Sequence, residues 1–233
     1  MRKSHIVLAG TFAGWLLSIS TAGAETIAIG ACMPPSCATI TQLSTNNGSI
    51  DSFSGAFADF TLSVTGQGPA NPVNLDSTTV YFANASGAPT SLDVFVTETG
   101  VTGPVAAALG FLSSFTQNLL TSGWSVTEAT FLDSGNTAFA LTTPLSSASF
   151  TTSDLTQIGT AVANTGSGPY SVTEEFAITT GGVLGNTNDT IDLTATPLPG
   201  ALALFAGGLS LLGVAGLRKR RQRLNLPYTP ATA

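Results

Sequence analysis

Cationic side chains are missing from most of this sequence. No Lys, Arg or His occurs between Glu25 and Leu217, and all seven Lys and Arg residues lie near the two ends. All thirteen Asp and Glu residues fall inside the cation-free stretch. A protein that binds nucleic acid needs a basic footprint, so the absence excludes nucleic-acid binding by this part of the chain.

The same absence excludes most catalytic chemistry. Without His the body lacks a Ser-His-Asp triad and imidazole ligands for zinc, copper or haem, and without Lys it lacks Schiff-base chemistry. Carboxylates remain, and two that face each other can hydrolyse a glycosidic bond. Glu98, Glu128 and Asp133 are candidates for such a glycosidase, the least favoured reading, whereas Glu174 and Glu175 are neighbours and point to opposite faces of a strand.

The N-terminus has the three parts of a secretory signal. Arg2 and Lys3 precede an apolar run over 6–19, and Ala22-Gly23-Ala24 forms a small-x-small cleavage site. We therefore predict a signal peptide over 1–24, with Ala22 and Ala24 as the small residues of its cleavage site and Glu25 as the first residue of the mature chain. The body is then exported into an oxidising environment.

The C-terminus has the features of a membrane anchor. Residues 200–217 form an uncharged run rich in Gly, Ala and Leu. As a helix this run measures about 27 Å, close to the ~30 Å hydrocarbon core of a bilayer, so we predict a transmembrane helix. A basic cluster over 218–223 follows, with Arg218, Lys219, Arg220 and Arg221 at its start. Positive charge is retained on the cytoplasmic side, so the body lies outside.

This tail resembles a known sorting signal. Pro197-Leu198-Pro199, the short apolar helix and the basic cluster together are similar to the PEP-CTERM signal of exported Gram-negative proteins, also catalogued as the ice-binding-protein C-terminal domain. The resemblance covers about 196–223; Leu198 stands where the family motif has Glu, and a tail over 224–233, expected to be disordered, extends beyond the usual end. The resemblance implies recognition by an exosortase-like membrane protease and transpeptidase, and delivery to the cell surface or extracellular matrix.

The body, residues 25–196, is long enough for one domain with a buried core. Apolar and hydroxyl side chains alternate with period two in several segments that turn residues separate, as in half-buried strands. The segments are Asp59–Thr65, Ser91–Thr97, Ser125–Phe131, Asn136–Thr142, Tyr170–Ile178 and Thr190–Thr194. We predict an all-β fold, an antiparallel β-sandwich of about 7–10 strands.

Two local patterns stand apart from this alternation. Pro104–Leu120 places Phe111, Phe115 and Leu119 four residues apart, which favours one short helix. The tetrapeptide Ser-Val-Thr-Glu occurs at 125–128 and again at 171–174. We interpret the repeat as chance in Thr-rich strands, because no longer period accompanies it.

Cys32 and Cys37 are the only cysteines. A close pair in an exported chain predicts a structural disulfide. A redox pair and metal ligands are the alternatives, but redox motifs have two intervening residues and no second pair is present for zinc.

No cofactor is required by the sequence, and calcium is the one ion that its oxygen-rich turns suit. The candidate ligands are Asp133 and Asn136 in one turn and Asp189 and Asp192 near another. Neither segment matches an EF-hand loop, and an ordinary Asx turn is the alternative.

Together these observations predict an exported, non-enzymatic protein of the cell surface or biofilm matrix. It would pass through an inner-membrane-anchored intermediate with a periplasmic body, its partners being the membrane, an exosortase-like enzyme and the polysaccharide matrix. The alternative is a β-sandwich module that binds neutral glycans, with or without calcium.

Overall fold

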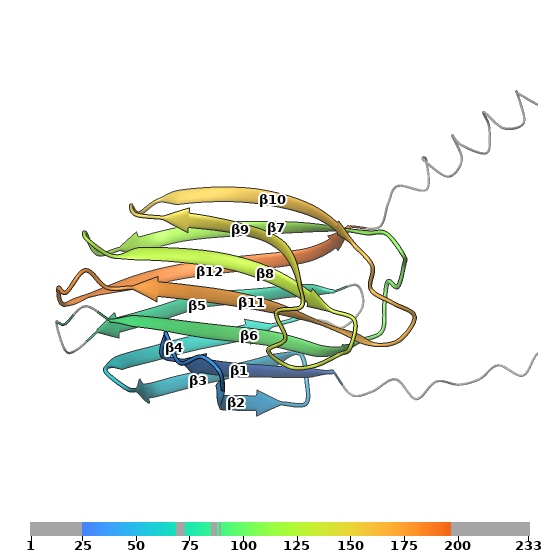
Figure 1. The fold of residues 1–233 in the computed structure, drawn as a ribbon, viewed down its shortest axis with the longest axis horizontal. Coiled ribbons are helices and arrows are strands. Elements are labelled where there is room, and N and C mark those ends of the chain that lie inside the picture. The colour runs from blue at the N-terminus through green and yellow to red at the C-terminus, as the bar shows by residue number, and fades with distance from the viewer. Residues whose placement is uncertain (1–24, 69–72, 85–87, 89, 197–233) are drawn as a thin grey trace, which may run out of the picture.

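Two antiparallel β-sheets of six strands each make up the part of the chain that the computed structural model describes, residues 25–196 without 69–72, 85–87 and 89. Sheet A has the order β2 (Thr41–Asn46), β1 (Thr26–Cys32), β6 (Ser91–Val101), β11 (Tyr170–Thr179), β8 (Ser125–Asp133), β9 (Thr143–Phe150). Sheet B has the order β10 (Leu155–Ala163), β7 (Leu109–Leu120), β12 (Gly185–Thr196), β5 (Asn74–Asn84), β4 (Phe60–Gln67), β3 (Ile50–Phe57). Figure 1 shows the two sheets stacked face to face.

The core lies between the sheets and follows the alternation of the strands. In β6, Leu92, Val94 and Val96 point inward, and in β12 Ile191 and Leu193 do the same; all five side chains are fully buried. Aromatic side chains fill the centre, and Phe82 of sheet B meets Phe176 of sheet A with ring centroids 6.3 Å apart. The predicted antiparallel sandwich is therefore confirmed.

The number of strands is larger than predicted, because the described residues form twelve strands where about 7–10 were expected. No helix occurs among the described residues, and the helix predicted over Pro104–Leu120 is wrong: β7 occupies Leu109–Leu120. Its inward side chains include the polar Ser113 and Gln117, which obscure the alternation. Within the described part no helix is long and apolar enough to span a membrane, and the predicted span over 200–217 lies outside that part.

The strand predicted over Asn136–Thr142 is also wrong. Residues 134–142, which we call the flap, cross the outer face of sheet A between β8 and β9 (Figure 1). Asn136 and Phe139 have φ angles of 57° and 60°, which a strand does not allow. Phe139 packs edge-on against Phe95 of β6 with ring centroids 6.4 Å apart.

Hydrogen bonds between backbone and side-chain groups hold the flap against sheet A. The Gly100 N–H donates to Asn136 Oδ1 at 2.7 Å, and the Ser171 hydroxyl donates to the Thr137 carbonyl at 2.9 Å. The Phe139 N–H donates to Thr97 Oγ1 at 3.2 Å. Gly30 lies beneath Phe139, where a Cβ would come within 2.9 Å of the ring. The flap therefore forms a third layer over part of sheet A.

Candidate functional site

Three Val-Thr-Glu segments lie on three neighbouring strands of sheet A. They occupy 96–98 of β6, 126–128 of β8 and 172–174 of β11. In each segment the Val and the Glu share one face of the strand, so a core Val places the Glu in the core. Glu98, Glu128 and Glu174 are all 0% exposed. The two Ser-Val-Thr-Glu segments, interpreted above as a chance repeat, thus lie on neighbouring strands that each bury a Glu.

The register arranges the three glutamates as a diagonal ladder across the inner face of sheet A. Glu98 lies opposite Val172, and Glu174 lies opposite Val96 on one side and Thr130 on the other. Glu128 lies opposite Phe176, one step further along β11. Diagonal neighbours of this kind have Cα atoms about 7–8 Å apart. We call the three residues the glutamate ladder.

The carboxyl groups of the glutamate ladder are at best weakly hydrogen-bonded: the Thr116 backbone lies near Glu128 and the Ser77 hydroxyl lies near Glu174, but neither is in hydrogen-bonding geometry. Among the described residues, neither carboxylate oxygen of Glu98, Glu128 or Glu174 has a group in hydrogen-bonding geometry. On sheet B, the Ser77 hydroxyl lies near Glu174 and the Gln117 amide lies near Asp189, and neither oxygen has a partner in hydrogen-bonding geometry within the described part of the chain. Such groups are costly to bury as ions, and even neutral acids lose the hydrogen bonds that water offered them.

Burial raises the pKa of every member. The pKa of Glu128 rises to about 9, first through burial and then through the charge of Asp189, with a partial offset from the Thr116 backbone. The pKa of Glu98 also rises to about 9, first through burial and then through the charge of the Glu25 carboxyl. Burial, above all, raises the pKa of Glu174 well above its usual range. Burial therefore favours the neutral acid at neutral pH for Glu98 and Glu128, and it shifts Glu174 in the same direction.

The ladder does not form a chelating site for one metal ion. Among the described residues, the group of three or more acidic, Cys or His side chains whose ligand atoms gather within 4.8 Å is Cys32, Cys37 and Asp93. Diagonal spacing keeps the ladder carboxyls farther apart than one ion requires. The glycosidase alternative loses support as well, because Glu98 and Glu128 are sealed between the sheets, away from any polysaccharide.

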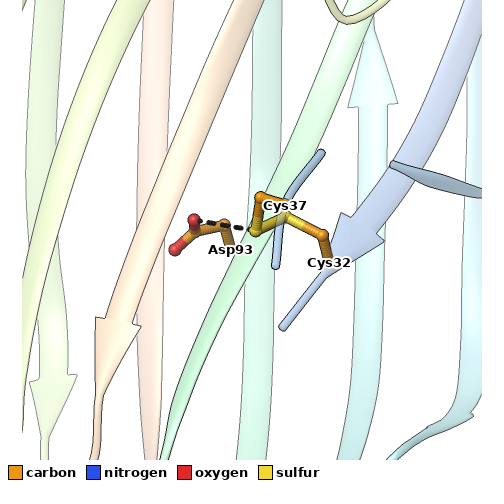
Figure 2. A group of neighbouring side chains, drawn as sticks. All are labelled: Cys32, Cys37 and Asp93. Atoms are coloured by element: carbon orange, nitrogen blue, oxygen red, sulfur yellow. Dashed lines mark hydrogen bonds between the residues drawn. A yellow bond between two sulfur atoms is a disulfide. The ribbon is translucent and has the colours of Figure 1, made fainter. Parts of the chain in front are cut away.

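The second cluster of interest lies on the outer face of sheet A (Figure 2). Cys32 and Cys37 form the predicted disulfide, and Oδ2 of Asp93 lies 3.4 Å from Sγ of Cys37. A disulfide sulfur carries no proton, so only the protonated carboxyl can donate across this contact. Burial raises the pKa of Asp93 to about 6, and burial and then the Asp93 charge raise the pKa of nearby Glu175 to about 7. With both sulfurs in the bridge, the cluster lacks thiolate ligands for a metal.

The candidate calcium ligands are divided between the two sheets. Asp133 and Asn136 lie at the start of the flap on sheet A. Asp133 accepts hydrogen bonds from the Thr137 N–H at 2.9 Å and the Thr142 hydroxyl at 3.0 Å. Burial opposes these hydrogen bonds, which nevertheless lower the pKa of Asp133. The oxygens predicted to hold calcium here pin the flap instead, as an Asx turn does.

Asp189 and Asp192 lie on β12 of sheet B and face opposite sides of it. Asp189 is fully buried and accepts from the Thr187 hydroxyl at 2.9 Å. Asp192 is half-buried on the outer face, where it accepts from Thr194 at 3.1 Å. The structure therefore does not bring the four candidates together.

The residues predicted to direct processing belong to other parts of the chain. Ala22, Ala24, Pro197, Leu198, Pro199 and the basic cluster lie outside the described residues.

No family model and no curated protein matches the chain. The solved structures similar to it include TmCBM61 in complex with β-1,4-galactotriose, at 9% identity and a TM-score of 0.31, covering 61% of this chain and 92% of that one. The adhesin domain of Epf from Streptococcus pyogenes is 14% identical, with a TM-score of 0.32, and the match covers 67% of this chain and 61% of that one. The enzymatically active domain of tailspike protein 4 of bacteriophage CBA120 is 11% identical, with a TM-score of 0.30, and the match covers 63% of this chain and 19% of that one. Likenesses this distant carry no argument about function.

Proposed function

We propose that this protein is an exported, non-enzymatic component of the cell surface or extracellular matrix, sorted through its C-terminal signal. One observation carries the proposal. All seven Lys and Arg residues lie at the two ends, beside the two apolar runs, and all thirteen acids lie between them. Cytoplasmic retention of positive charge and export of the body account for this division.

The surface of the body supports a passive role. Of its thirteen acids, only Asp59 and Asp154 are exposed among the described residues, and the ladder is buried. Catalysis at neutral pH usually requires ionisable groups that are poised near that pH and open to substrate. The half-buried pair Asp93 and Glu175 is open to solvent only in part and is backed by a disulfide.

The intact mass of the protein, recovered from the membranes and the medium of its native host, tests the proposal. A mass that begins at Glu25 and ends between Thr196 and Gly200 is expected, because the sorting enzyme would cut beside Pro197-Leu198-Pro199. A mass that runs to Ala233 and occurs only in membranes would contradict sorting and leave a plain anchored body.

The outer face of sheet B favours a second function, the binding of neutral glycans. Strands β7 and β10 carry no charged residue, and their outer face combines hydroxyl groups, such as those of Thr116 and Thr156, 3.3 Å apart, with the exposed Ile158 and Val162. Trp124 and Tyr170 are buried in the core, so recognition would depend on hydrogen bonds rather than on aromatic stacking. A glycan array with and without chelator tests both the binding and its dependence on calcium; no bound glycan would end this alternative.

A further inference from the structure

Each sheet ends in two edge strands, and three of the four are protected. Edge strands expose unpaired backbone groups, which proteins protect with short length, bulges, Pro or inward-pointing charges. Strand β2 has six residues and a bulge against β1, and β9 carries Pro144 beside a bulge against β8. Strand β3 carries the buried Asp51, whose Oδ1 accepts from the Ser44 hydroxyl of β2 at 2.8 Å.

Strand β10 has none of these protections. It pairs with β7 over nine consecutive residues, from Leu155 opposite Gln117 to Ala163 opposite Leu109, without a bulge. It contains no Pro and no charged residue. Its outward side chains include Ile158, 70% exposed, and Val162, 67% exposed. An edge of this kind is a template for pairing with another strand.

We propose that β10 is a self-association edge, which pairs with β10 of a second copy of this chain. In antiparallel pairing about Thr160, that residue lies opposite itself, and Ile158 of each copy lies opposite Val162 of the other. Both cross-strand pairs are then aliphatic and lie on one face, where they stabilise the pairing. The two copies are related by a two-fold axis, and sheet B continues through the contact.

Charge permits a second copy as the occupant, and the matching of Ile158 with Val162 about Thr160 favours it. Copies of a body that has acidic groups and no cation repel each other wherever ionised carboxylates meet. Strands β7 and β10 bring no such group to the contact, so this edge is a place where identical bodies approach without repulsion. The proposal goes beyond sorting and does not depend on it, since membrane-held and released copies have the same edge.

A Thr160→Cys variant of the full chain tests the register. Thr160 is exposed, and the two wild-type cysteines already form a disulfide, so the new thiol has no partner within its own body. Opposite residues of an antiparallel pair have Cα atoms about 4.5–5.5 Å apart, within reach of a disulfide. After mild oxidation of the membrane fraction and of the medium, we expect a dimer on a non-reducing gel that disappears on reduction.

Leu184→Cys is the matched control, because Leu184 is 65% exposed and lies away from β10, just before β12. Charged substitutions at the two aliphatic positions then test the pairing of the strands. Adding Ile158→Lys and Val162→Lys to the Thr160→Cys chain sets like charges opposite each other and should reduce the dimer at least tenfold. Adding Ile158→Lys and Val162→Glu instead sets opposite charges face to face and should restore it.

Equal cross-linking of the Leu184→Cys chain would show random collision and overturn the proposal, as would the absence of any dimer. A dimer that both charge pairs leave unchanged would also overturn it. Each readout uses bodies held in the membrane as well as released ones, so a failure of sorting does not imitate a failure of pairing.

Discussion

The glutamates of the ladder differ from most buried charges in having no countercharge. Buried carboxylates are ordinarily paired with Lys or Arg, and this body has neither. Protonation is the remaining way to neutralise Glu98, Glu128 and Glu174. The proton that each takes up on folding links the stability of the body to pH.

Stability should therefore fall as pH rises. The pKa of Glu128 moves from its ordinary value of 4.5 in a solvated chain to about 9 in the folded body, so the folded state binds more protons between these values. Its stabilising contribution is complete below about pH 4.5 and is lost as pH rises toward 9, at up to about 1.4 kcal/mol per pH unit for each such group. Urea unfolding from pH 5 to pH 9 should show the decline.

Glu174→Gln should flatten that decline, because the amide keeps the shape and cannot ionise. Glu175→Gln, at the adjacent residue on the outer face, is the matched control: the pKa of Glu175 rises only to about 7, so this variant should flatten the profile below pH 7 and leave the decline from pH 7 to pH 9 unchanged. Parallel pH profiles for wild type and Glu174→Gln would contradict the assignment of a neutral acid.

The disulfide is expected to contribute modestly. Cys32 and Cys37 are five residues apart, and closing so short a loop restricts the unfolded chain only slightly. The Cys32→Ala/Cys37→Ala variant should lose about 2 kcal/mol of unfolding free energy. Unfolding of the variant and of the wild type under oxidising conditions measures the difference; a loss above about 4 kcal/mol would mean that the bridge also holds β1 in the sheet.

At the scale of elements, the position of the flap depends mainly on one side chain, that of Phe139. Phe139 reaches over sheet A to Phe95, while the other contacts of the flap are polar. Phe139→Ala should cost about 2 kcal/mol, less than a fully buried Phe, because the ring is half-buried.

Leu141→Ala, in the same flap but 40% exposed, should change the unfolding free energy by no more than about 0.5 kcal/mol. Limited proteolysis should then cut the flap of the Phe139→Ala protein first. Equal stability of the two variants would contradict the packing role of Phe139.

Alternation predicted several strands, including β8 and β11 with their inward Glu128 and Glu174, but it failed for β7, where apolar residues also recur every four residues. In β7, Ser113 bonds Thr130 across the sandwich at 2.8 Å and Gln117 bonds Thr187 at 3.0 Å, so tertiary partners offset the cost of their burial. In the flap the alternation is present, but φ angles above 50° at Asn136 and Phe139 bend the chain away from a strand.

The candidate site was predictable only in part. The disulfide followed from the spacing of two cysteines. The Val and the Glu of Val-Thr-Glu are two residues apart, so they share one face of the strand. This spacing indicates a buried Glu only once the Val is known to be buried, because the sequence alone does not say which face points inward. The order of β6, β11 and β8, which turns three separate acids into one ladder, is set by long-range pairing.

On the scale of the whole molecule, formal charge and effective charge differ. The body has thirteen acids, yet the pKa values of Glu98 and Glu128 rise to about 9, and that of Glu174 lies well above its usual range. At pH 7 folding should therefore take up about one proton at each of Glu98 and Glu128, and about half a proton at each of Glu175 and Asp189, whose pKa values are both about 7; the raised pKa of Glu174 adds to this uptake.

Potentiometric titration of the folded and the urea-unfolded protein measures this uptake directly. An uptake near zero at pH 7 would mean that the ladder is ionised in the folded state and must hold a counterion.

Both ends of the body lie at the same end of the sandwich. Strand β1 begins at Thr26, opposite Thr99, and β12 ends at Thr196, opposite Gly110, on either side of the connection from β6 to β7 (Figure 1). A force that pulls these two ends apart would peel β1 and β12 from their neighbouring strands, starting at that end. The backbone hydrogen bonds between strands would then break a few at a time rather than all at once. As a link between two tethers the body would therefore yield at low tension. A load borne in a matrix would have to pass through its faces and edges, β10 among them.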